Sequence, residues 1–132
     1  MAGSQTGAQG TYCVRDDRQN ICADAVQPHP DKVSIVRPGG HLALRPSEGR
    51  LSSVSASFGA LGCDGAGSPT RVRFHNGAWR VTAPARPGAY DLLVFTRFRT
   101  ETTKGDTSMA FGVVVSRTKV RRIVPAARYA VC

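Results

Sequence analysis

Arginines are the residues of this sequence best suited to a chemical task, the binding of an anion. Asn76-Gly77 favours a type I′ turn, because both central positions need a positive φ that Gly adopts freely and Asn tolerates. A hairpin about this pair sets Arg73 directly opposite Arg80. Like charges opposed in this way destabilise a sheet, whereas guanidinium groups bind carboxylates and phosphates in a fork geometry. An anion lying across the two arginines, or the carboxylate of Asp91, would make this pair useful.

Two further arginines, Arg97 and Arg99, alternate onto one face of a long strand. If that strand neighbours the hairpin in one sheet, five guanidinium groups line one surface. The predicted anion-binding set is therefore Arg71, Arg73, Arg80, Arg97 and Arg99. The alternative is that these side chains point into water, where salt leaves only a modest repulsion between them.

The charge of the chain is unevenly placed. The 132 residues have a formal net charge of +9. Residues 1–66 hold six basic and six acidic side chains, whereas residues 67–132 hold twelve basic and three acidic ones. Such asymmetry indicates either an anionic partner or a surface kept soluble by repulsion. We expect Phe74 and Trp79 to be buried, which leaves only Phe95 to stack on bases, so sequence-specific binding of nucleic acid is not expected.

Four cysteines, Cys13, Cys22, Cys63 and Cys132, form an even set without a C-x-x-C motif, and they allow three pairings. Polar turn residues between the first two, and the position of Cys132 at the last residue, favour Cys13–Cys22 and Cys63–Cys132. Disulfides persist outside the cytosol, which predicts an exported protein, secreted or lipid-anchored at the cell surface. The polar first ten residues lack the features of a signal peptide. No apolar run reaches the roughly 20 residues of a membrane helix.

Metal binding and catalysis have less support. His29, His41 and His75 could gather with Met109, yet no pair has ligand spacing, so we expect no metal and no cofactor. No G-x-S-x-G motif marks a nucleophile. The carboxylates that could act in pairs, Glu48, Glu101 and the aspartates, fall in turns or at isolated strand positions. The alternative is a small secreted enzyme or a metal (copper) carrier, with a site assembled from loops.

Short alternating strands with frequent turn signals must position these side chains. We expect a flexible leader at residues 1–10, a disulfide loop from Cys13 to Cys22 and an extended connector, VQPHPDK. Strands follow at 33–36, 41–45, 50–60, 70–75 and 78–83, then a turn and a long strand within residues 84–100, and a last strand at 107–117. Pro125 argues against a regular strand in the basic tail. The prediction is one all-β domain over residues 11–132, a two-sheet antiparallel sandwich of seven or eight strands.

Alternation also predicts which residues face the core. They are Val33, Ile35, Leu42, Leu44, Val54, Ala56, Phe58, Val72, Phe74, Trp79, Val81, Leu92, Val94, Thr96, Phe98, Met109, Phe111, Val113 and Val115. Leu93 and Phe95 fall on the opposite face of their strand. Either the C-terminal tail covers them or they form a patch that binds a partner.

The motifs VRPGGHLAL and WRVTAPARPGAYDLLVF resemble those of bacterial extracytoplasmic immunoglobulin-like sandwich domains, over about residues 30–117. In that family a PG-x-Y turn opens a long central strand, which places Tyr90 like a tyrosine corner. The chain departs from antibody-type domains in having no Cys…Trp…Cys pattern across the core. The resemblance implies a secreted or lipoprotein module that binds or supports another molecule.

The last two strands are also similar to those of periplasmic copper carriers, whose connecting loop holds an Asp-Gly-His with a copper-binding His. The corresponding loop here is TTKGDTS, with Lys104 and no histidine. A lysine is a poor neighbour for a metal ion, so this difference argues against a copper carrier. We therefore predict a non-enzymatic, extracytoplasmic binding or structural module whose partner is an anionic cell-envelope polymer or a protein.

Overall fold

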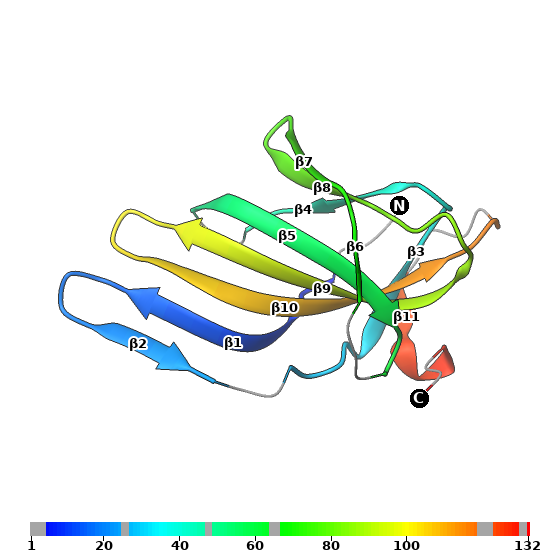
Figure 1. Cartoon of the computed structure of the whole chain (residues 1–132), viewed down its shortest axis with the longest axis horizontal. Helices are drawn as coiled ribbons and strands as arrows, with labels where there is room; N and C mark the ends of the chain where they lie inside the picture. The colour runs from blue at the N-terminus through cyan, green and yellow to red at the C-terminus, as the bar shows by residue number, and fades with distance from the viewer. Residues whose placement is uncertain (1–4, 25–26, 47–48, 64–66, 119–122, 130–131) are drawn as a thin grey trace.

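Two sheets packed face to face form the architecture, as the alternating pattern predicts (Figure 1). The computed structural model describes residues 5–24, 27–46, 49–63, 67–118, 123–129 and 132. Within these residues it contains eleven strands, eight in one sheet and three in the other, and one short 3₁₀ helix. The all-β, two-sheet prediction is confirmed.

The eight-stranded sheet is built around the long hairpin of β9 (Gly88–Arg99) and β10 (Lys104–Val115). The strand β5 (Arg50–Ala60) pairs with the other edge of β9, and β6 (Ser68–Pro69) follows it. The free edge of β10 pairs first with β1 (Ala8–Arg15) and then, in parallel, with β3 (Lys32–Val36). The outermost strands are β2 (Asn20–Ala23) beside β1 and β11 (Ile123–Pro125) beside β3.

The three-stranded sheet has the order β4 (His41–Leu44), β8 (Ala78–Thr82) and β7 (Val72–His75). The hairpin of β7 and β8 has the predicted register, with Arg73 opposite Arg80. Asn76 and Gly77 adopt φ angles of 48° and 77°, as a type I′ turn requires. The turn chemistry therefore fixes the face on which each arginine of the hairpin lies.

The main core fills the space between the sheets. Its buried residues include Phe58, Val81, Leu92, Val94 and Val113, all predicted to face inward. Phe74 is the exception, since 60% of its surface is exposed. The expectation that it is buried was wrong, because β7 is the edge strand of the small sheet and its tip extends beyond the residues that would cover it (Figure 1).

A second apolar cluster lies on the opposite face of the large sheet. It joins Val33 and Ile35 of β3 and Val114 of β10 to Leu61, Val124 and Ala126. The tail therefore packs near Ala89 at one end of this face, while Phe95 farther along β9 stays 54% exposed. Contrary to expectation, Pro125 ends a short strand, which β11 tolerates as an edge strand that needs no further donor.

The N-terminal segment is more ordered than the sequence suggested. The segment predicted as a disulfide loop is the hairpin β1–β2, with Cys13 opposite Cys22. Of the predicted leader, residues 1–4 lie outside the described residues, and Gln5 donates a hydrogen bond from Nε2 to the carbonyl oxygen of Gly112 at 2.8 Å. The strand β1 begins at Ala8.

Both predicted disulfides, Cys13–Cys22 and Cys63–Cys132, are present. Tyr90 donates a hydrogen bond from its hydroxyl to the carbonyl oxygen of Arg86 at 2.7 Å, the contact expected at a tyrosine corner. None of the described helices is long and apolar enough to span a membrane.

Candidate anion-binding surfaces and the hairpin groove

The opposed pair Arg73 and Arg80 lies at the centre of the hairpin, and both side chains are exposed. Neither arginine has a carboxylate partner among the described residues. In the described part of the chain no Lys or Arg forms an ion pair, and the one ion pair joins His29 to Asp91. Asp91 therefore does not neutralise the arginine pair, as the sequence had allowed.

The five predicted arginines do not form one surface. Arg71, Arg73 and Arg80 belong to the three-stranded sheet and its border, whereas Arg97 and Arg99 lie on β9 of the eight-stranded sheet. Leu92 and Val94 face the core, so the alternating Arg97 faces away from the small sheet. The condition for a joint surface, that β9 neighbours the hairpin in one sheet, is not met.

The small sheet nevertheless carries a uniformly basic surface, which we call the basic face. It comprises the outer side of β4, β7 and β8 and the turns that flank these strands. Residues 36–46 and 67–90 contain no acidic residue, and their six arginines are Arg37, Arg45, Arg71, Arg73, Arg80 and Arg86. All six are exposed. An anion approaching this face therefore meets no negative side chain from these segments.

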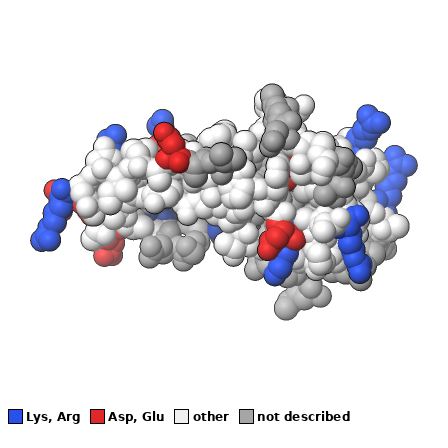
Figure 2. All heavy atoms as spheres, turned by 90° about the horizontal axis from the view of Figure 1, so that it is seen from below, with Lys and Arg blue, Asp and Glu red and all other residues white. Residues whose placement is uncertain are grey.

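The large sheet has a different pattern. Its register places Arg99 between Arg50 and Lys104, and Lys104 opposite Arg15, so four cations cross four strands. Acidic residues lie beside this basic row, since Asp106 lies opposite Arg97 two residues along and Glu101 lies in the turn after β9. Seen from the side away from the hairpin, red acidic groups lie among the blue basic ones (Figure 2).

A groove of about 770 Å³ opens between the sheets beneath the hairpin. We call it the hairpin groove. Phe74 and Trp79 line it from the small sheet, Leu51 from β5, and Arg45, Arg50 and Arg99 also contribute to its wall. None of the described lining residues is acidic. Glu48, which lies in the sequence between the lining residues Pro46 and Gly49, falls outside the described residues.

The geometry of the groove follows from two local features. Trp79 donates a hydrogen bond from Nε1 to the carbonyl oxygen of Leu51 at 3.3 Å and so joins the two sheets at the inner end. The ring of Phe74 packs edge-to-face on Trp79, with 5.2 Å between ring centroids. At the rim, Gly49 has a φ of 67°, and a Cβ there would collide with the carbonyl oxygen of Arg99. A glycine thus lets the chain pass close to β9 and sets Arg50 opposite Arg99.

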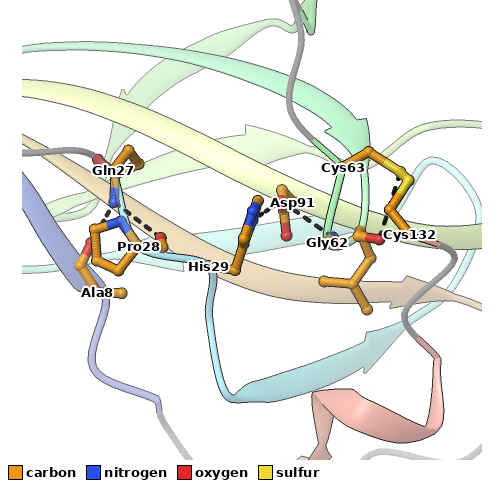
Figure 3. A network of polar contacts seen from close by, with 9 residues as sticks. Ala8, Gln27, Pro28, His29, Gly62, Cys63, Asp91 and Cys132 are labelled. Carbon is orange, nitrogen blue, oxygen red and sulfur yellow. Dashed lines mark hydrogen bonds and ion pairs between the residues drawn. A yellow bond between two sulfur atoms is a disulfide. The ribbon is translucent and has the colours of Figure 1, made fainter.

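His29 has a structural contact that the sequence did not reveal. Its Nδ1 lies 3.0 Å from Oδ2 of Asp91, which also accepts a hydrogen bond from the backbone N–H of Gly62 (Figure 3). Gln27, in the same connector, donates to the carbonyl oxygen of Ala8 and accepts from Ser108. These contacts fasten the connector across the large sheet.

The other candidates for chemistry stay apart. Among the described residues no group of three or more His, Cys, Asp or Glu could hold a metal ion. His41 and His75 lie on separate strands of the small sheet, and Met109 lies on β10. Lys104 and Asp106 belong to β10 rather than to a loop, because the turn closes earlier, with the N–H of Thr100 donating to the carbonyl oxygen of Thr103 at 2.8 Å.

No protein-family model, no curated protein and no solved structure matches this chain.

Proposed function

We propose that this protein is a non-enzymatic binding module that works outside the cytoplasm and holds an anionic polymer on its basic face. The observation that carries the proposal is the opposed pair Arg73 and Arg80, which is exposed in a sheet without an acidic residue and has no carboxylate partner in the described part of the chain. Repulsion in this pair is relieved when phosphates or carboxylates lie across it.

The location outside the cytoplasm is supported by two disulfides, because thiols stay reduced in the cytosol. Anionic polymers of the cell envelope are ligands of the required charge there. We also propose that the chain is an immunoglobulin-like module of the bacterial extracytoplasmic type, for which the sandwich and the contact of Tyr90 are support.

Retention on immobilised heparin and on teichoic acid across a salt series tests the proposal. Each phosphate or carboxylate neutralised by a cation adds to the slope of log K against log[salt]. The variant Arg73→Ser/Arg80→Ser should lower this slope by about one to two. The matched control is Arg99→Ser/Lys104→Ser, which removes an equally opposed cationic pair from the large sheet.

We expect the control variant to keep most of the wild-type slope. Equal slopes for the two variants would mean that only net charge matters and would overturn the assignment of the basic face. A normal slope in both would overturn polymer binding by either sheet.

A further inference from the structure

The hairpin groove has the composition of a recognition site distinct from the basic face. The two lie on opposite sides of the same hairpin, since Phe74 and Trp79 point between the sheets whereas Arg73 and Arg80 point outward. Aromatic residues and arginine are the types enriched at protein interfaces. Of the arginines in the described lining, only Arg45 also belongs to the basic face.

The charge of the groove lining indicates the sign of the charge on its ligand. Arg45 follows β4, Arg50 begins β5 and Arg99 ends β9, so the lining of the groove includes one arginine from each of three separate segments at its rim. All three are exposed and without a carboxylate partner among the described residues. A ligand that satisfies all three must carry more than one negative group.

The apolar part of the lining indicates the chemical nature of the uncharged part of the ligand. Phe74 exposes 60% of its surface, although an aromatic side chain gains most when it is covered. Apart from the indole N–H, which already binds Leu51, Ser52 is the one neutral polar side chain in the described lining. A sugar ring would find few hydrogen-bond partners here. An aromatic or large aliphatic group would cover Phe74 and lie against Trp79.

We propose that the hairpin groove binds a short acidic peptide segment of a partner protein, with an aromatic or large aliphatic side chain between carboxylates. The apolar side chain packs on Phe74 and Trp79, and the carboxylates pair with Arg45, Arg50 and Arg99. The volume of about 770 Å³ suits a short segment rather than the face of a folded domain.

Trp79 provides the test, because it is the only tryptophan of the chain and lines the groove. The disulfide-bonded full chain is titrated with the peptide Glu-Asp-Phe-Asp-Glu while tryptophan emission is recorded. Two control peptides separate the contributions. In one, serine replaces phenylalanine at the same charge, and in the other, Gln and Asn replace the acids.

We expect saturable binding of the acidic phenylalanine peptide and at least about tenfold weaker binding of each control peptide. Phe74→Ala should weaken binding by about tenfold. The matched variant Phe95→Ala, which removes an exposed ring from the large sheet, should leave it unchanged. Circular dichroism shows whether both variants are folded, and Arg45→Ser provides a second test that leaves both aromatic rings in place.

A titration in which the acidic phenylalanine peptide causes no change in tryptophan emission would overturn the proposal. Equal binding of the serine peptide would refute the apolar anchor, and equal binding of the neutral peptide would refute the role of the arginines. Tighter binding of a short oligothymidylate or an oligogalacturonate, abolished by Phe74→Ala, would assign the groove to another class of ligand.

Discussion

Replacing Arg80 by glutamate should stabilise the fold and at the same time weaken polymer binding. The register sets Arg80 directly opposite Arg73, and directly opposed residues of an antiparallel pair lie about 4.5–5.5 Å apart at their Cα atoms. Arg80→Glu turns this repulsive pair into an attractive one. Opposite effects on fold stability and on ligand affinity are expected where two like charges bind one ligand.

The size of the effect follows from Coulomb's law. Two unit charges about 7 Å apart in water interact by about 0.6 kcal/mol. Screening over a Debye length of about 8 Å at physiological ionic strength leaves about 0.25 kcal/mol. Reversing the sign of one charge exchanges a repulsion for an attraction of equal size, so the free energy of unfolding should rise by about 0.5 kcal/mol.

Urea denaturation of the oxidised protein at low and at high salt measures this change. The control is Arg71→Glu, which makes the same change of charge beside Thr82, whose N–H donates to the carbonyl oxygen of Arg71. We expect the gain for Arg80→Glu to exceed that of the control and to vanish in about 1 M salt, where the Debye length is about 3 Å. A gain that persists at high salt, or that Arg71→Glu reproduces, would refute the reasoning.

Three further predictions concern the fold. Replacing Phe58, which is 6% exposed in the main core, by alanine should lower the free energy of unfolding by about 3–5 kcal/mol, as measured by urea denaturation. A loss below about 1 kcal/mol would contradict its place in the core. The disulfides Cys63–Cys132 and Cys13–Cys22 close loops with sequence separations of 69 and 9 residues. Replacing Cys63 and Cys132 by serine should therefore lower the free energy of unfolding by about 4 kcal/mol, and replacing Cys13 and Cys22 by about 3 kcal/mol. The reverse order in thermal melts would contradict the loop-entropy explanation. Gly77 has a φ of 77°, so Gly77→Ala should lower the unfolding free energy by about 1–2 kcal/mol, and an unchanged urea midpoint would show that the turn is not type I′.

The local features of the fold could be predicted from the sequence because short-range chemistry determines them. Asn76-Gly77 specifies a turn with two positive φ angles, and the register of the hairpin follows. The alternation along β5 places Phe58 in the core, and the position of Cys132 at the end of the chain suggested its pairing with Cys63.

The missed features depend on pairing between distant segments. No local sequence feature distinguishes a hairpin that joins the sheet of β9 from one that packs across it. The sequence therefore allowed the five arginines to share one surface, on the condition that the two elements belong to one sheet. The basic row from Arg50 to Arg15 exists only through the registers of β1, β5, β9 and β10. The hairpin groove was missed because the exposure of Phe74 depends on how far the small sheet extends over the large one.

The most direct test of the central claim is an NMR titration of the ¹⁵N-labelled, oxidised protein with a short heparin or teichoic acid oligomer. If the polymer lies on the basic face, the amides of β4, β7, β8 and their flanking turns shift first, including those of Arg73 and Arg80. Shifts confined to β1, β5, β9 and β10, or spread evenly over the surface, would contradict the account.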